Sequence, residues 1–153
     1  MATRQLLQGA IGQVLGVVGL LAAAACVWAP ITGAGGKIMQ VELNVFSGRP
    51  NPHWDLTPQE GQEFLKRFRS LPKGKGSGSV RDGLGYRGLI VTAGSQAIDG
   101  FDEVVISEGV VLGRQAGGVQ MFTDKDRALE RWLFGTGKGH VAPDLYGEIS
   151  KEF

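Results

Sequence analysis

Apolar residues fill the N-terminal part of the chain. Residues 14–31 contain no charged or strongly polar side chain, and the mainly apolar sequence extends back to Leu6, which provides at least the roughly 20 residues needed to cross a bilayer core. Such a helix is hydrophobic on every side and lacks the polar face of a helix on a soluble domain. The pattern predicts a transmembrane anchor over residues 1–31, a flexible linker over residues 32–36 and a soluble domain over residues 37–153.

Three interpretations of the apolar segment remain open. A cleaved secretory signal would use Ala23 and Ala25 as the small residues before a cut at Cys26, and a lipoprotein would carry acyl chains on Cys26. A retained anchor would keep the whole segment. We favour the retained anchor, because a lipoprotein signal usually has Leu at the position of Ala23 and because Pro30 should block a cut after Ala29.

Glycines recur along one side of the predicted anchor helix. Gly12, Gly16 and Gly19 follow one another at spacings of three or four residues, and a face of this kind lets a second helix approach closely. We expect these glycines to pack against a helix of another membrane subunit. The alternative is that an apolar segment of low complexity simply collects glycines.

The basic residues that flank the anchor are nearly balanced, with Arg4 on one side and Lys37 and Arg49 on the other. A short tail before a first apolar segment usually stays in the cytoplasm. We therefore expect a single-pass protein of a bacterial membrane, with its soluble domain on the periplasmic side.

Beyond the linker, alternating and helical patterns follow one another. The pattern predicts strands over residues 38–46, 87–92, 103–107, 110–114 and 119–122, and helices over residues 58–70, from 124 to 135 or 137, and from 143 to near 153. Strands and helices are largely segregated along the chain. This order predicts an α+β domain, with a small mixed or antiparallel sheet and two to three helices on one face.

Two of these helices carry start signals and an apolar side. Thr57, Pro58 and Glu60 form a capping box with proline at the first helical position, and Phe64 and Phe68 lie on one side of the helix that follows. The second helix is expected to be capped by Thr123. The residues expected to be buried on the second helix are Ala128, Leu129, Trp132 and Leu133.

A proline-rich turn separates the first predicted strand from the first helix. Residues 46–54 read FSGRPNPHW, and the two prolines restrict the backbone before folding. Exposed Arg and Trp are typical interface anchors, so Arg49, Asn51 and Trp54 are candidate partner-binding residues. In the alternative, which we favour, Trp54 belongs to the core and Arg49 hydrogen-bonds carbonyls of the turn.

The same stretch, together with residues 83–88, residues 128–133, Gly139 and His140, resembles a small bacterial domain family. The likeness covers about residues 40–150. The members of that family are uncharacterised exported or hypothetical proteins, so the resemblance implies no activity and no site residues.

Composition and charge narrow the possible functions. Hydrophobic residues make up 42% and charged residues 20% of the chain, which is typical of a globular protein, and the formal net charge is +1. Without a basic excess we expect no binding to nucleic acid. Basic residues do gather at the end of the first helix and just beyond it. Those in the helix are expected to form a solvated face, and the others could contact lipid headgroups or an acidic surface of a partner. These basic residues are Lys66, Arg67, Arg69, Lys73, Lys75 and Arg81.

Familiar catalytic and metal-binding patterns do not occur in the sequence. The two histidines, His53 and His140, are far apart and Cys26 lies in the apolar segment, so no metal-ligand spacing is present. None of the serines sits in a nucleophile-elbow pattern. The glycine-rich residues 135–139 follow a predicted helix and lack the spacing of a phosphate-binding loop. We expect neither a cofactor nor a metal ion.

Together these patterns favour a non-enzymatic accessory subunit of a bacterial membrane protein complex. The anchor would pack among other membrane subunits in the lipid bilayer, while the domain covers or braces a surface outside it. The alternative is an exported protein or lipoprotein that acts as an enzyme or ligand-binding domain, through a pocket around Arg49, Trp54 and His140.

Overall fold

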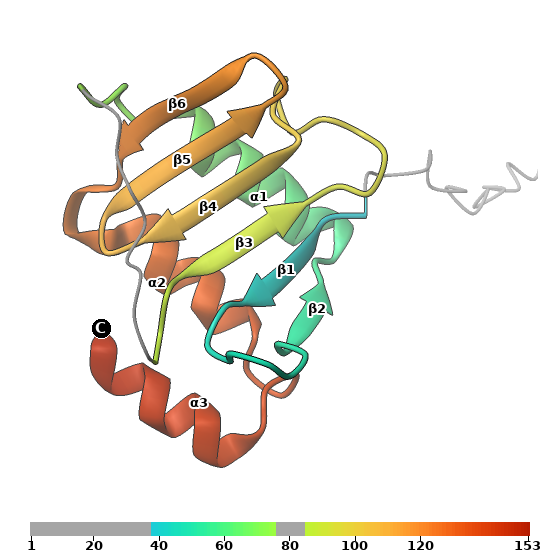
Figure 1. Cartoon of the computed structure of the whole chain (residues 1–153), viewed down its shortest axis with the longest axis vertical. Coiled ribbons are helices and arrows are strands. Elements are labelled where there is room, and N and C mark those ends of the chain that lie inside the picture. Colours follow the sequence, from blue (N-terminus) through green and yellow to red (C-terminus); the bar gives the residue numbers. More distant parts are fainter. Residues whose placement is uncertain (1–37, 76–84) are drawn as a thin grey trace, which may run out of the picture. The chain divides into compact units, whose positions relative to one another are not determined.

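A six-stranded sheet forms the centre of the computed structural model, which describes residues 38–75 and 85–153 (Figure 1). The strands are β1 (Gln40–Leu43), β2 (His53–Asp55), β3 (Leu89–Thr92), β4 (Glu103–Ser107), β5 (Val110–Gln115) and β6 (Gly118–Thr123). Their order across the sheet is β2-β1-β3-β4-β5-β6, and every neighbouring pair is antiparallel. The sheet is therefore antiparallel, one of the two types of sheet that the sequence predicts.

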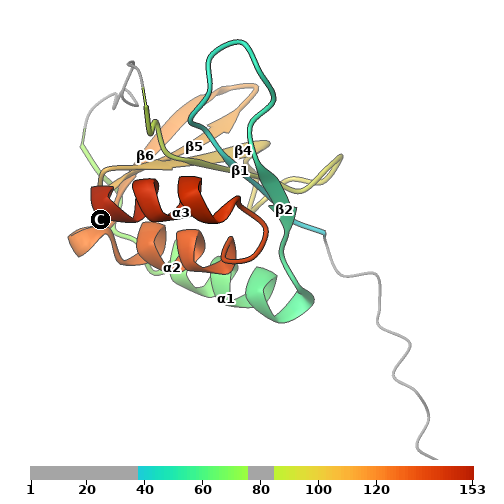
Figure 2. The same cartoon turned by 90° about the horizontal axis from the view of Figure 1, so that it is seen from below.

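Three α-helices, α1 (Pro58–Arg69), α2 (Ala128–Thr136) and α3 (Pro143–Ile149), lie on one side of this sheet, with α2 between the other two (Figure 2). Two 3₁₀ turns, η1 (Lys125–Arg127) and η2 (Ser150–Glu152), precede α2 and follow α3. The prediction of an α+β domain with helices on one face is confirmed for the described residues.

The core lies between the sheet and the helices. Leu43, Leu89, Ile106 and Val111 stand side by side across four adjacent strands, and all four are fully buried. Phe64 of α1 belongs to the same buried cluster. Burial of each such side chain stabilises the fold by roughly 1.5–3 kcal/mol. These four residues are inward-facing apolar positions of the alternating pattern of their strands.

Helix α1 begins as the sequence predicts. The backbone N–H of Glu60 donates to Thr57 Oγ1 at 3.2 Å, and the backbone N–H of Thr57 donates to Glu60 Oε2 at 2.8 Å. Both bonds satisfy donors that the first turn of a helix leaves without partners. The capping box is confirmed, and so is the burial of Phe64 and Phe68.

Strand β2 corrects the expected element order. The sequence predicts a turn over residues 47–52 and no strand between that turn and the first helix, whereas His53–Asp55 pairs with β1 and Trp54 stands opposite Val41. Prolines and a glycine just before it concealed a strand of only three residues. Because Val41 faces the core, this register turns the indole of Trp54 inward as well.

The start of α2 also differs from the expectation. Thr123 does not cap the helix; the carboxylate of Asp124 accepts from the backbone N–H groups of Leu129 and Glu130 at 3.0 and 2.9 Å. Leu129 and Leu133 are buried as predicted, but Ala128 is exposed and Trp132 is only half-buried. The helix is rotated so that Glu130 and Phe134 face inward instead.

The predicted anchor and linker, with Gly12, Gly16, Gly19 and Cys26, lie outside the described residues. Among the residues that the structure describes, no helix is long and apolar enough to cross a bilayer.

Candidate functional site

The turn between β1 and β2 is held together from within. Asn51 Oδ1 accepts from the backbone N–H groups of Val45 and Phe46 at 3.1 and 2.8 Å, and Asn51 Nδ2 donates to Glu42 Oε1 at 2.8 Å. The side-chain amide of Asn51 therefore supplies hydrogen bonds to Glu42 of β1 and to the backbone of the turn, where the pairing of β1 with β2 has ended. Of the three candidate partner-binding residues, Asn51 has a structural role that accounts for its polar groups.

Two arginines contact the same turn. Arg87 donates from Nη2 to the carbonyl of Phe46 at 2.6 Å and from Nε to Asn44 Oδ1 at 3.0 Å. Arg49 is exposed, and its guanidinium lies 3.4 Å from the centre of the Phe46 ring. The arginine that holds a turn carbonyl is thus Arg87, while Arg49 stacks on the surface of the turn.

Trp54 lies in the core, at 3% exposure, and its indole N–H donates to Thr136 Oγ1 at 2.9 Å. Its ring packs against Gly137, where a Cβ atom would lie only 2.8 Å from the indole. This placement matches the interpretation that we favoured for Trp54. His140 is exposed, and neither it, Arg49 nor Trp54 lines the pocket described below.

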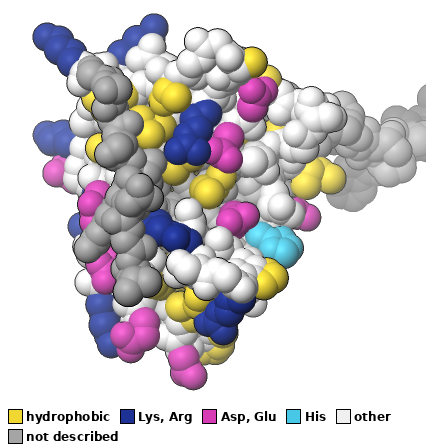
Figure 3. Space-filling view, viewed as in Figure 1, with side chains coloured by type: hydrophobic (Ala, Val, Ile, Leu, Met, Phe, Trp, Pro, Cys, Tyr) yellow, Lys and Arg dark blue, Asp and Glu magenta, His cyan; other side chains and the backbone are white. Residues whose placement is uncertain are grey.

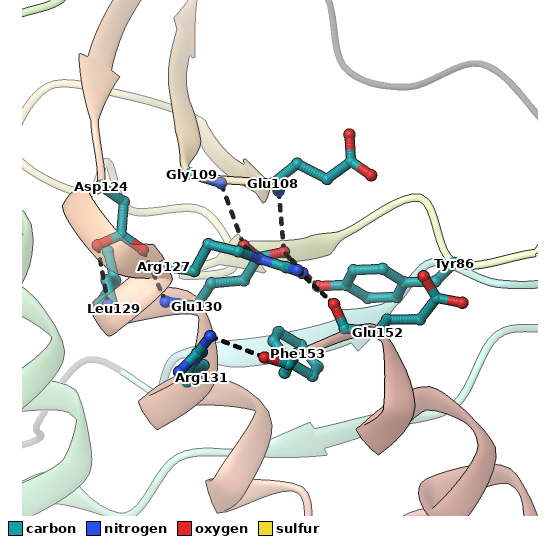
Figure 4. Close-up of polar contacts among 10 residues, drawn as sticks. All are labelled: Tyr86, Glu108, Gly109, Asp124, Arg127, Leu129, Glu130, Arg131, Glu152 and Phe153. Carbon is teal, nitrogen blue, oxygen red and sulfur yellow. Dashed lines mark hydrogen bonds and ion pairs between the residues drawn. The ribbon is translucent and has the colours of Figure 1, made fainter.

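A buried carboxylate lies where α2 meets the β4–β5 turn (Figure 4). Glu130 is 0% exposed. Its Oε1 accepts from the Tyr86 hydroxyl at 2.6 Å, from the backbone N–H of Glu108 at 3.1 Å and from Arg127 Nη2 at 3.2 Å. Its Oε2 accepts from Arg127 Nε at 2.8 Å and from the backbone N–H of Gly109 at 3.3 Å. Five donors therefore surround one carboxylate.

These contacts decide the charge states of the cluster. Burial would raise the pKa of Glu130, but hydrogen bonds from Arg127 and Tyr86, and the positive charge of Arg127, outweigh burial and hold the pKa below its ordinary value. Burial, followed by the charge of Glu130 and its hydrogen bond, raises the pKa of Tyr86. The cluster is therefore an ion pair with a neutral phenol at physiological pH.

The cluster also holds the last residues of the chain. Arg127 Nη1 donates to the carbonyl of Glu152, and its guanidinium lies 4.5 Å from the centre of the Phe153 ring. Arg131 Nη2 donates to the Phe153 carbonyl at 2.7 Å (Figure 4). Since every oxygen of Glu130 already has partners, this arrangement joins elements to one another and is suited to stabilising the fold.

A different region offers an open concave surface. A pocket of about 360 Å³ lies among the end of α1, the turn before β4, and the β5–β6 hairpin. We call it the aromatic pocket. Its lining residues are Phe68, Arg69, Lys73, Asp99, Phe101, Gln115, Gln120 and Phe122.

Three phenylalanines form the apolar part of the aromatic pocket. The ring centres of Phe68 and Phe122 are 5.1 Å apart, and each lies 5.9 Å from that of Phe101. All three pairs meet edge to face, the arrangement that aromatic rings prefer. Phe68 is buried, whereas Phe101 and Phe122 are partly exposed and so present apolar surface to an occupant.

Polar side chains surround these rings. Arg69 donates from Nη2 and Nε to the two carboxylate oxygens of Asp99 at 2.6 and 2.7 Å, and these bonds raise the pKa of Arg69. Gln120 Nε2 donates to the carbonyl of Met121 at 3.0 Å. Lys73 makes no ion pair with any other residue in the described ranges. The rim therefore combines one paired cation, one cation without an ion-pair partner among the described residues, and two carboxamides.

On the face of the sheet turned away from the helices, acidic and basic side chains are interspersed with apolar ones (Figure 3). No group of three or more His, Cys, Asp or Glu side chains within residues 38–75 and 85–153 could hold a metal ion. The aromatic pocket is thus the candidate site with the clearest binding geometry.

Sequence reasoning found only parts of this pocket. The sequence places Phe68 on the buried side of the first helix, and Arg69 and Lys73 in the basic group at the end of that helix and just beyond it. The other residues come from distant segments, and no local spacing links them. Comparison with protein-family models, with curated proteins and with solved structures finds no match to the chain.

Proposed function

We propose that the chain is a binding protein without catalytic activity, an accessory subunit of a bacterial membrane complex that contacts a partner through the aromatic pocket. The observation that carries this proposal is the pocket itself. Partly exposed aromatic rings within a ring of charged and amide side chains have the anatomy of a protein-binding surface, with an apolar centre and a polar rim.

The buried polar groups support a binding role. Glu130 is a buried carboxylate, and a buried carboxylate is a candidate for acid–base chemistry. Its oxygens, however, already accept hydrogen bonds from five donors. Asn51 and Arg87 are likewise engaged within the turn that they hold. A domain with such a rigid interior can present a preformed surface, which lowers the entropic cost of binding.

The apolar N-terminal sequence supports attachment to a membrane complex. Residues 14–31 have the composition of a spanning helix, and the glycines at 12, 16 and 19 would allow close packing against a second helix. In this arrangement the anchor contributes contacts inside the bilayer, and the pocket contributes contacts outside it.

The test is purification of the full-length chain from its native membrane in a mild detergent. We expect a fixed stoichiometric set of membrane proteins to co-purify. Recovery of the chain alone contradicts the proposal. Gly16→Leu should leave the protein in the membrane but separate it from the complex, because a branched side chain prevents close helix packing. Val17→Leu, which lies off the glycine side, is the matched control and should keep the complex.

The size of the aromatic pocket also favours a second candidate function, that of an exported ligand-binding domain. Its volume of about 360 Å³ lies within the range of sites for small molecules, about 300–1,000 Å³. In that case the chain would purify alone and carry a small molecule, which native mass spectrometry would detect.

A further inference from the structure

We propose that the aromatic pocket binds an extended peptide segment of the partner, in which a large apolar side chain stands next to an acidic residue. This inference rests on the proposed binding function and specifies the chemistry of the partner. It joins three features of the pocket: its apolar floor, its two carboxamides, and Lys73, which has no ion-pair partner among the described residues.

The floor selects a large apolar side chain. Phe101 and Phe122 are partly exposed and meet at nearly a right angle, 88° between ring planes, with Phe68 buried beneath them. Another ring or a long aliphatic side chain placed here would contact the faces and edges of several rings at once. A volume of about 360 Å³ is at the small end of ligand sites, which suits one side chain and the peptide groups beside it.

The carboxamides at the rim match the polar groups of a peptide. Gln120 uses its Nε2 on the carbonyl of Met121, which fixes the amide and leaves Oε1 to accept an N–H. Gln115 is exposed at the end of β5 and can both donate and accept. Peptide groups carry one donor and one acceptor each, whereas a lipid tail would offer no hydrogen bond to Gln120 Oε1 or to the amide of Gln115.

The charge at the rim favours an acidic neighbour. Arg69 is committed to Asp99 by two hydrogen bonds, so the charges of these two residues largely cancel. The ammonium of Lys73 has no counter-ion in the described part of the chain, and a carboxylate next to the apolar side chain would supply one. A basic residue at that place would meet like charge, so the lysine contributes specificity as well as attraction.

Binding of short labelled peptides to the full-length chain in detergent micelles tests this inference. The probe is a blocked Gly-Phe-Asp-Gly peptide, compared with versions in which Asn replaces Asp or Ala replaces Phe, with empty micelles subtracted. By fluorescence polarisation we expect the acidic probe to bind roughly two- to fivefold more tightly than its Asn version, as for an exposed ion pair. The Ala version should lose about tenfold or more.

Variants assign the effect to the pocket. Lys73→Gln should abolish the preference for Asp over Asn, while Lys66→Gln, an exposed lysine of α1 outside the pocket, should keep it. Gln120→Leu should weaken all three probes. Equal binding of the Asp and Asn probes, or of the Phe and Ala probes, overturns the inference, and so does an unchanged preference in Lys73→Gln.

The native complex separates this inference from the proposed function. If the wild-type chain co-purifies with partners and Lys73→Glu retains them at the same stoichiometry, the peptide inference fails and the accessory-subunit proposal stands. If the wild-type chain carries no partners but binds the acidic probe with the expected preference, the subunit proposal fails and the peptide inference stands.

Discussion

Replacement of Glu130 by glutamine is the sharpest test of how the domain is stabilised. The substitution keeps the size of the side chain but removes its charge and turns one acceptor oxygen into an NH₂ group. If that group takes the place of Oε2, it faces the N–H of Gly109 and Nε of Arg127; in place of Oε1, it faces three donors, one of them the Tyr86 hydroxyl. Either orientation places donors against donors.

The expected cost follows from the burial of the pair. Glu130 is fully buried and Arg127 is 21% exposed, and removal of one partner from a buried pair costs about 3–5 kcal/mol. A loss of about 4 kcal/mol shifts the unfolding equilibrium roughly a thousandfold. It is a large part of the roughly 5–15 kcal/mol that stabilises a typical domain.

Urea unfolding followed by tryptophan fluorescence measures this cost, and Glu103→Gln is the matched control. Glu103 also pairs with an arginine, Arg114, at 2.9 Å, but Arg114 is 48% and Glu103 31% exposed, so the control should lose no more than about 1 kcal/mol. If the uncompensated charge of Arg127 is the cause, adding Arg127→Met to Glu130→Gln should cost less than the sum of the single changes. A loss in Glu130→Gln no larger than in Glu103→Gln would refute the reasoning.

The dependence on pH has a definite sign. Because the folded state holds the pKa of Glu130 below its ordinary value, its contribution is complete above the unfolded pKa of about 4.3 and is lost as the pH falls through the folded pKa. The difference in stability between wild type and Glu130→Gln should therefore be constant near neutral pH and shrink below about pH 4. A difference that grows on acidification contradicts this assignment.

Three further predictions use the same unfolding assay or intact mass. Leu129→Ala, at a side chain 2% exposed, should cost about 2–5 kcal/mol, whereas Val119→Ala, 59% exposed, should change stability by no more than about 0.5 kcal/mol. Gly113→Ala places a Cβ atom 2.7 Å from the ring of Phe101, so it should cost roughly 1–3 kcal/mol and weaken binding in the aromatic pocket. The intact mass of the native protein should include the apolar segment, and a mass that begins at Cys26 contradicts the retained anchor.

Local signals in the sequence predicted those elements that depend on neighbouring residues. The capping box at Thr57 fixes the start of α1, because its two hydrogen bonds join residues three apart. The hairpin between β4 and β5 was placed within one residue, since alternating apolar residues flank the turn at Glu108 and Gly109. In both cases the information lies within a few positions of the chain.

The elements that were missed depend on distant or unusual contacts. Asp124 caps α2 across residues Asp126 and Arg127, whose φ values are 56° and 53°. Residues other than glycine seldom adopt this backbone conformation. No spacing rule describes such a start. The burial of Glu130 depends on Tyr86, 44 positions away, and a charged residue on a helix is ordinarily read as exposed.

The buried ion pair and Gln115 of the aromatic pocket are connected to opposite ends of β5. The N–H of Gly109, just before β5, donates to Glu130, while Gln115 at the other end of β5 lies on the rim of the aromatic pocket. Five residue steps in a strand span roughly 17 Å, and effects of substitutions more than about 7–10 Å apart usually add independently. Loss of the buried ion pair should therefore lower the folded fraction without affecting Gln115, whereas Phe122 of the same pocket pairs with Val111, two residues from Gly109. The ion pair consists of Arg127 and Glu130, neither of which lines the pocket, so a weakened probe in a well-folded Lys73 variant reports on the pocket.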